Sequence, residues 1–382
     1  MDNAIDSSFD SFELDVVFDR VVRSIDVGFG LVKFTVPDDG DVRFVNFPSI
    51  AIPSDLGSAR ALGSRKRNTF DVPVGGTYYE VGVEIQLAQA GGSFGRDVTD
   101  DFYRSPIYEA LTKGALRYMA EQGDRTIDLL VLGLPLNQFH DPIRREYLRN
   151  LYTGSIELGK GYSIQVDRVI VQAQPMGAYV ALEDYVEPLN RLFANTNGAP
   201  LTLASEEDLD FLNVLIVDPG EYTLDWLLVQ DGAVNQRASG AASDAGRHRV
   251  IRSVIDALSS DLKRPLGPAI FPRVNHAMRS DKFVKLAGVS YDIAKYEPEA
   301  MAVVEDAINQ LIDGLRNCQE IIDLIVLVGG HPQQYHSVLM RRFPAIPIFV
   351  VPDAVYANVC GFQKIGVVES LLAPQGGNAG RR

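Results

Sequence analysis

Short runs of β-branched and aromatic residues, separated by tight turns, dominate the chain from residue 21 onward. Residues 21–27, 31–36 and 42–47 are three such runs, with turns at residues 28–30 and 38–40 between them. Runs of this length bounded by glycine and aspartate predict consecutive antiparallel strands. We therefore expect a three-stranded meander near the start of the chain.

The pattern then changes to one that is typical of alternating helices and parallel strands. Ser105 and Pro106 form an N-cap and a first helical position, and apolar residues recur at helical spacing to about residue 122. Residues 127–134 form a continuous apolar run, which predicts a strand covered on both faces. A second helix is expected after Asp141, and a further strand at 166–171.

The same plan restarts in the second half of the chain. Three β-prone runs at 212–217, 224–229 and 233–238 are again joined by tight turns. Later elements are expected as helices at 301–318 and within 353–372, and as strands at 323–328 and 346–351. This repetition predicts duplication of one α/β unit.

Composition restricts the classes of protein to consider. The chain has 382 residues, of which 46% are hydrophobic and 23% charged, which is typical of a globular protein with two or three packed units. Its net charge of −14 disfavours direct, tight DNA binding over a wide surface. Cys318 and Cys360 lie in apolar surroundings far apart in the sequence, which favours buried thiols over a disulfide or a metal site. With no apolar run of about 20 residues and no basic leader, we expect a cytoplasmic protein without membrane contact.

Two hairpin turns carry the candidate chemistry. The first runs from Asp26 through Gly28 and Gly30 to Lys33, and the second runs from Asp218 through Gly220. Glycines let backbone N–H groups approach an anion closely, and a lysine reaching back toward the turn suits a polyphosphate. Two such hairpins facing each other would hold a phosphate chain from both sides.

Two further features extend this site. An aspartate at each turn can hold a hydrated Mg²⁺ that bridges the phosphates. A third segment, in which a buried strand ends at Gly329 and Gly330, offers bare backbone against which a flat base can lie. The sequence therefore predicts a nucleotide site built from three separate segments.

These segments, with connecting segments at 175–179 and 357–362, resemble in order and spacing the superfamily of actin, Hsp70 and the sugar kinases. Within it, the compact chain and the turn at 133–136 are most similar to the bacterial ParM/StbA plasmid-partition group. The resemblance implies an α/β actin-like ATPase fold: two duplicated RNase H-like domains with inserted subdomains, and the nucleotide in the cleft between them. The implied boundaries are an acidic flexible arm at 1–18, a first domain at 19–190 with an insertion at 48–104 and a completing helix at 352–373, a second domain at 208–351 with an insertion at 246–299, and a disordered tail at 374–382.

The resemblance also assigns roles to residues. Gln172, Asp26 and Asp218 are the implied catalytic residues; Gln172 would orient the attacking water, and the two aspartates would hold Mg²⁺ mainly through water. Phosphate contacts are implied for Gly28, Phe29, Gly30, Lys33, Gly220, Glu221, Tyr222 and Thr223, and adenosine contacts for Gly329, Gly330, His331 and Arg247. The residues alone leave open whether Gln172 is a solvated strand end, His331 a surface histidine and Arg247 part of a solvated helix face.

The function that the resemblance implies is nucleotide-dependent polymerisation. The protein would hydrolyse ATP, or GTP, and form filaments of its own copies that segregate a plasmid through a DNA-bound adaptor protein. Three alternatives stay open: a cytoskeletal scaffold, a sugar kinase and an Hsp70-type ATPase. The lack of a sugar-binding signature disfavours the kinase, and the end of the chain soon after the last expected helix disfavours the chaperone.

Overall fold

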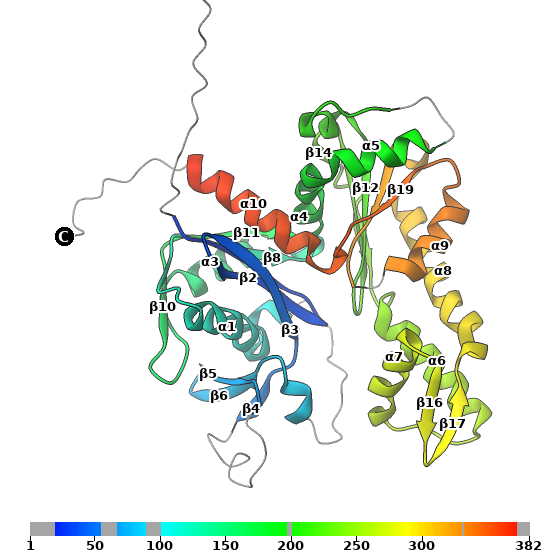
Figure 1. Ribbon diagram of the computed structural model, residues 1–382, viewed down its shortest axis with the longest axis horizontal. Coiled ribbons are helices and arrows are strands. Elements are labelled where there is room, and N and C mark those ends of the chain that lie inside the picture. The colour runs from blue at the N-terminus through cyan, green and yellow to red at the C-terminus, as the bar shows by residue number, and fades with distance from the viewer. Residues whose placement is uncertain (1–19, 55–66, 89–100, 197–200, 331, 373–382) are drawn as a thin grey trace, which may run out of the picture.

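The computed structural model describes residues 20–54, 67–88, 101–196, 201–330 and 332–372, which form two α/β halves side by side (Figure 1). The predicted arm at 1–18, the predicted tail at 374–382 and His331 lie outside these residues. Among the described residues, none of the helices has both the length and the apolar character that a bilayer span requires.

The first half is built on a five-stranded sheet in the order β11-β8-β1-β2-β3. The predicted meander is confirmed: β1 (Val22–Val27), β2 (Leu31–Asp38) and β3 (Asp41–Pro48) are antiparallel neighbours. Parallel to β1 run β8 (Leu129–Leu134) and then β11 (Val169–Ala173). All six residues of β1 and of β8 are buried, as expected for strands covered on both faces.

The second half repeats this order. Its sheet runs β14-β13-β12-β18-β19, with a further short strand, β15, paired with β13. The first strand of each half is therefore central, with its antiparallel hairpin partner on one side and a parallel strand on the other, so the predicted duplication is confirmed. The bounds are β12 (Val214–Pro219), β13 (Leu224–Gln230), β14 (Ala233–Val234), β15 (Gly240–Ala242), β18 (Leu324–Leu327) and β19 (Ile348–Val350).

Two of the expected strands are each divided in the structure. The run at 127–134 separates into β7 (Thr126–Ile127) and β8, because Asp128 turns aside to accept the backbone N–H of Val21 at 2.7 Å. The run at 166–171 separates likewise into β10 (Ser163–Val166) and β11. β7, β10 and β9 (Gly154–Glu157) form a small sheet of their own. The apolar run at 127–134 does not reveal this division, because Ile127 and all of β8 are buried alike.

The helices begin where the capping residues predicted. Ser105 accepts the N–H of Tyr108 at the start of α1 (Pro106–Glu121), and Asp141 accepts the N–H of Ile143 at the start of α3 (Pro142–Tyr152). The helix expected at 301–318 is shifted and runs as α8 (Glu297–Gly314), because Pro298 starts it earlier. The remaining helices of the two halves are α2 (Leu136–Phe139), α4 (Gln174–Val180), α5 (Val186–Ala194), α9 (Pro332–Arg342) and α10 (Ala357–Leu372).

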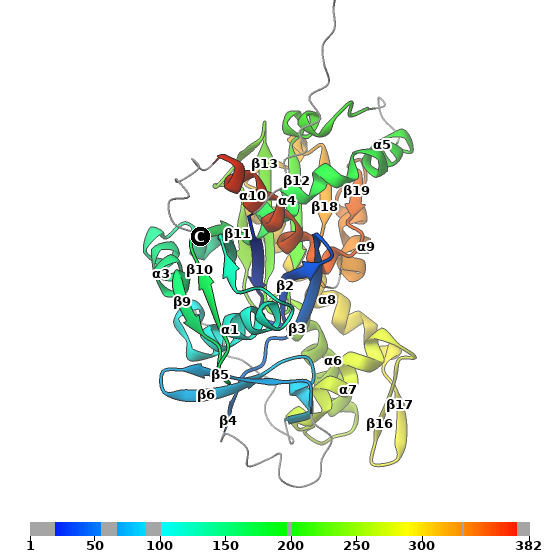
Figure 2. The ribbon, with the colours of Figure 1, turned by 60° about the vertical axis from the view of Figure 1, so that its left-hand side comes forward.

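Each half carries additional elements at the same end of the molecule (Figure 2). In the first half these form a small sheet of β4 (Ile52–Ser54), β5 (Phe70–Val74) and β6 (Thr77–Val81). In the second half they are α6, α7 and a two-stranded hairpin, with bounds α6 (Arg247–Asp261), α7 (Phe271–Arg279), β16 (Phe283–Leu286) and β17 (Val289–Asp292).

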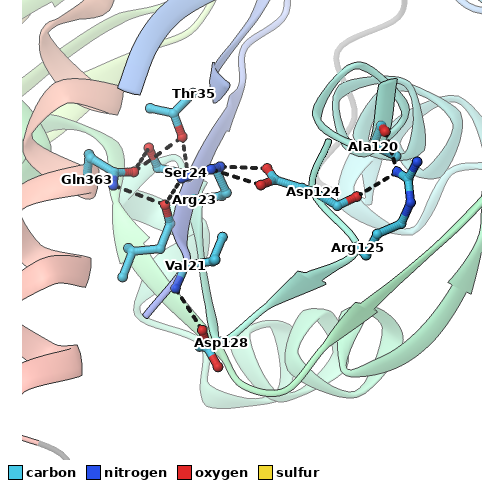
Figure 3. Close-up of polar contacts among 10 residues, drawn as sticks. Val21, Arg23, Ser24, Thr35, Ala120, Asp124, Arg125, Asp128 and Gln363 are labelled. Atoms are coloured by element: carbon cyan, nitrogen blue, oxygen red, sulfur yellow. Dashed lines mark hydrogen bonds and ion pairs between the residues drawn. The ribbon is translucent and has the colours of Figure 1, made fainter. Parts of the chain in front are cut away.

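Buried polar contacts fix β1 in place (Figure 3). The side chain of Gln363 on α10 accepts from the hydroxyls of Ser24 and Thr35, both at 3.2 Å, and donates to the carbonyl of Val22. On the other side of β1, Arg23 makes two hydrogen bonds with Asp124, at 2.7 and 2.9 Å. Because buried polar groups that lose a partner are costly, these contacts hold β1, and the residues at its end, in one position relative to α10.

Candidate functional site

A cavity of about 580 Å³ lies between the two halves, at the turns of the β1–β2 and β12–β13 hairpins. Most of the predicted site residues line it, namely Asp26, Gly28, Phe29, Gly30, Lys33, Asp218, Gly220, Glu221, Tyr222, Thr223, Gly329 and Gly330. The fold therefore brings together three segments that are distant in the sequence: the two hairpin turns and the end of β18.

Asp26 and Lys33 face each other across the first hairpin. They are register partners on β1 and β2, and the Lys33 ammonium lies 2.8 Å from Asp26 Oδ2. Asp26 Oδ1 accepts a hydrogen bond of 2.6 Å from Gln174 Nε2. Burial alone would lower the pKa of Lys33, but the carboxylates of Asp26 and Asp218 outweigh it and raise that pKa above 10.5. Lys33 therefore stays charged at the centre of the site.

Asp218 and Asp225 occupy the corresponding positions of the second hairpin. They are register partners on β12 and β13, so a carboxylate stands where the first hairpin has its lysine. Asp218 Oδ2 accepts from Asn358 Nδ2 at 2.9 Å, and Asp225 Oδ2 accepts from the Thr223 hydroxyl at 2.6 Å. Burial raises the pKa of Asp218, and it raises the pKa of Asp225 to about 7. A half-buried and a buried carboxylate that face each other in this way favour the binding of a cation.

The same turn closes both hairpins. Gly28 N–H donates to the carbonyl of Leu31 at 3.1 Å, and Gly220 N–H donates to the carbonyl of Thr223 at 2.8 Å. Gly329, at the end of β18, has a φ of +79°, and a Cβ there would overlap Asp218 Oδ1. Only glycine lets the backbone pass this close to the carboxylate without strain.

The tips of the two hairpins touch across the cavity. A Cβ on Gly30 would lie 3.1 Å from the Cβ of Glu221, and the rings of Phe29 and Tyr222 meet edge to face with centroids 5.9 Å apart. Phe29 also contacts Phe102, beside α1, at 5.2 Å between centroids. The two halves are thus in direct contact at the residues expected to bind phosphate.

Several buried polar atoms at the cavity have no partner among the described residues. They are the Tyr108 hydroxyl, Asp225 Oδ1 and Asn358 Oδ1, and all three residues line the cavity. A buried polar atom without a hydrogen bond costs about 1–3 kcal/mol, so such atoms mark places where a polar ligand or water belongs. The cavity is therefore suited to a strongly polar ligand.

Two predicted site residues that the structure describes, Gln172 and Arg247, do not line the cavity. Gln172 is half-buried in β11, opposite Gly133 of β8, whereas Gln174 two residues later reaches the cavity and Asp26. Arg247 is 3% exposed and donates to Asn275, which does line the cavity. His331 lies outside the described residues.

Sequence reasoning missed Gln174, Asp225, Asn358 and Asn275. The first three lie in or beside segments that were already singled out: Gln174 directly precedes Pro175, Asp225 lies in the second hairpin, and Asn358 lies in the connecting segment 357–362. The pairing of Asp218 with Asp225 follows from hairpin register, which could have identified Asp225. No comparable signal marks Asn275.

Residues 24–177 match the family of actin-like protein N-terminal domains, and this span contains the whole first sheet from Ser24 onward. This segment is similar to the N-terminal domains of actin-like proteins. The duplicated sheets of the chain and its cavity between the halves are the α/β actin-like fold that the motifs predicted.

Several solved structures have the same fold over nearly the whole length of this chain. The apo ParM protein of pSK41 is 15% identical with a TM-score of 0.62, covering 92% of this chain and 98% of its own. A 15-stranded ParM filament from Clostridium botulinum is 17% identical with a TM-score of 0.65, covering 91% and 99%. The archaeal actin homologue Ta0583 in complex with ADP is 16% identical with a TM-score of 0.63, again covering 91% and 99%. The comparison with curated protein sequences finds no match.

Proposed function

We propose that the chain binds ATP, or GTP, with Mg²⁺ between its two halves, hydrolyses it, and assembles into filaments that segregate a plasmid. The observation that carries this proposal is the pairing of Asp26 and Asp218 across one cavity, each held by a side-chain amide from a different helix. Lys33 interacts electrostatically with both carboxylates. This arrangement presents one cation and two oriented carboxylates to a polyphosphate and its metal ion.

The residues present fit a hydrated Mg²⁺. Asp26 and Asp218 supply carboxylate oxygens, the ligand type that Mg²⁺ prefers, and the unpartnered Asn358 Oδ1 can accept a hydrogen bond from a metal-bound water. When bound, Mg²⁺ offsets negative charge on the phosphate oxygens. Lys33 and the backbone N–H groups at the hairpin tips would hold the phosphates, and Gly329 and Gly330 would lie against the nucleoside.

Gln174 is the side chain that we propose to orient the attacking water, in place of Gln172. It lines the cavity beside Asp26 and is itself held by the 2.6 Å contact to Asp26 Oδ1. An amide can position water without removing its proton, which suits slow hydrolysis driven by geometry and electrostatics.

Closure of the two halves would couple nucleotide binding to assembly. The hairpin tips already meet at Gly30 and Glu221 and at Phe29 and Tyr222, so phosphate bound between them bridges both halves. A closed shape presents fixed surfaces to the next copy, and head-to-tail contacts of this kind generate open filaments. Two structures with this fold, the ParM filament from Clostridium botulinum and the AlfA filament bound to AMPPNP, are themselves filaments.

The DNA cargo would be held through an adaptor protein. The net charge of −14 opposes tight binding of this chain to the phosphate backbone. Submicromolar, salt-sensitive binding of the purified protein to random duplex DNA would contradict the adaptor.

Electron microscopy and pelleting test the proposal directly. Protein incubated with Mg²⁺ and ATP or GTP should yield filaments and a pellet, and EDTA or omission of nucleotide should abolish both. Lys33→Ala should abolish assembly as well, whereas Lys263→Ala, an exposed change on a turn far from the cavity, should leave it intact. Nucleotide binding and turnover without any filament would contradict the assembly part of the proposal.

A further inference from the structure

Arg247 and Asn275 form an arrangement that the proposed function does not use. Arg247 begins α6, is 3% exposed, and donates from Nε and Nη2 to Asn275 Oδ1 at 3.0 and 2.6 Å. Nη2 also reaches the backbone carbonyl of Asn275 at 3.5 Å. A buried guanidinium therefore holds one half-buried asparagine of α7 by both its side chain and its backbone.

This contact fixes which way the Asn275 amide faces. A guanidinium only donates hydrogen bonds, so the atom that faces Arg247 must be the amide oxygen. The Nδ2 amino group is consequently turned away from Arg247, and it has no partner among the residues described. Since Asn275 lines the cavity, its side chain can offer a ligand two N–H donors, whereas its amide oxygen is already bonded to Arg247.

Two rows of side chains connect this asparagine to the second phosphate hairpin. Glu221 at the hairpin tip interacts electrostatically with Arg247, and Arg247 holds Asn275. Beside that polar row, His248 stacks between Tyr222 and Phe271, with centroid distances of 4.8 and 4.9 Å. Asn275 is thus placed beyond the hairpin tips, on the wall of the cavity that α7 provides rather than at the phosphate turns.

We propose that Asn275 donates hydrogen bonds to an acceptor atom of the nucleoside, on the base or the ribose, and that Arg247 is the positioning residue that orients it. The proposal rests on the proposed function, because its ligand is a nucleotide. The family resemblance implied that Arg247 contacts adenosine directly. In this proposal Arg247 acts through Asn275 instead. Burial lowers the pKa of Arg247 to about 10, which leaves the guanidinium charged and a donor at neutral pH.

Binding constants for Mg·ATP, Mg·GTP and magnesium tripolyphosphate test this inference by calorimetry. Asn275→Ala should weaken the binding of at least one of the two nucleotides about 3- to 10-fold, the effect of one or two lost hydrogen bonds. It should leave the binding of tripolyphosphate unchanged. Asn275→Asp is the discriminating variant, because it keeps an oxygen for Arg247 but has no N–H donor. It should fold with unchanged or higher Tm and still bind the nucleotide as weakly as Asn275→Ala.

Arg247→Ala should reproduce the loss of nucleotide affinity, and the double variant with Asn275→Ala should lose no more than either single one. Arg273→Ala, on the same helix but away from the cavity, is the matched control and should bind as wild type. Wild-type affinity in Asn275→Asp, or an equal loss for tripolyphosphate, would overturn the inference. If the wild type bound neither nucleotides nor tripolyphosphate, the proposed function would fail and this inference with it.

Discussion

A Cβ on Gly361 would overlap the backbone carbonyl oxygen of Gly177, because α10 and α4 cross with their backbones in contact at these two glycines. The crossing matters for the site, since Gln174 is the first residue of α4 and Asn358 the second of α10. Close approach of the two helices therefore delivers both amides to the two aspartates.

Gly361→Ala should destabilise the protein by about 1–3 kcal/mol or prevent folding, because backbone rather than a flexible side chain blocks the added methyl group. Denaturant unfolding followed by circular dichroism measures the effect. Gly267→Ala is the control, since nothing lies within 4 Å of its added Cβ. Equal midpoints for the two variants would show that the crossing can relax.

Asp218→Ala should lower nucleotide turnover by about 10²-fold or more, because it removes one of the two carboxylates that face the cavity and leaves Asn358 without its partner. Phosphate release at saturating Mg·ATP gives the rate, and near-UV circular dichroism checks the fold. Glu299→Ala, an exposed change in the first turn of α8, should retain the wild-type rate. Unchanged turnover in a folded Asp218→Ala protein would remove Asp218 from the catalytic site.

The two glutamines before Pro175 are predicted to differ sharply. Gln174→Ala should slow phosphate release about 10²-fold with little change in nucleotide affinity, because its amide contacts Asp26 within the cavity. Gln172→Ala should behave as wild type, since that side chain does not line the cavity. Single-turnover hydrolysis and equilibrium binding separate the two effects. The reverse ranking would restore the water-orienting role to Gln172.

The raised pKa of Asp225 predicts that the stability of the nucleotide-free protein depends on pH. Burial raises its pKa to about 7 in the folded state, whereas the unfolded chain titrates near 3.8. The folded protein therefore binds this proton more tightly than the unfolded chain does. The resulting contribution to the free energy of unfolding is complete below pH 3.8 and is lost as the pH rises through about 7. Asp225→Asn, which stays neutral, should raise Tm at pH 8 and raise it less as the pH falls.

Thermal unfolding of wild type and Asp225→Asn from pH 5 to pH 8, in EDTA, measures this difference. Asp39→Asn, in an exposed turn, is the matched control and should show no pH-dependent difference from wild type. A Tm gain in Asp225→Asn that is equal at every pH would contradict the assignment.

The hairpins could be predicted from sequence because strand, turn and returning strand are adjacent in the chain. Asp26, Lys33 and Asp218 are positioned by register within their own hairpins, which alternation and turn residues reveal. The placement of Gln174 and Asn358 at the cavity could not be predicted, because it depends on where α4 crosses α10 at Gly177 and Gly361. Asn275 could not be identified from the sequence for the same reason, since only tertiary packing brings it to Arg247.

The divided strands show what a local pattern of apolar residues cannot predict. A continuous buried run such as 127–134 has no polarity change that reports a switch from one sheet to another, and the switch depends on the contact between Asp128 and the distant Val21. Local pattern thus predicted the strands of the core, and long-range hydrogen bonds decided their ends.

Light scattering and phosphate release recorded together on one sample test whether nucleotide binding and hydrolysis are coupled to filament assembly. With Mg²⁺ and ATP or GTP, scattering should rise only above a critical protein concentration, phosphate release should follow that rise, and EDTA should abolish both signals. Phosphate release with flat scattering across a wide range of protein concentration, accompanied by phosphorylation of a small-molecule acceptor, would contradict the account and favour a kinase.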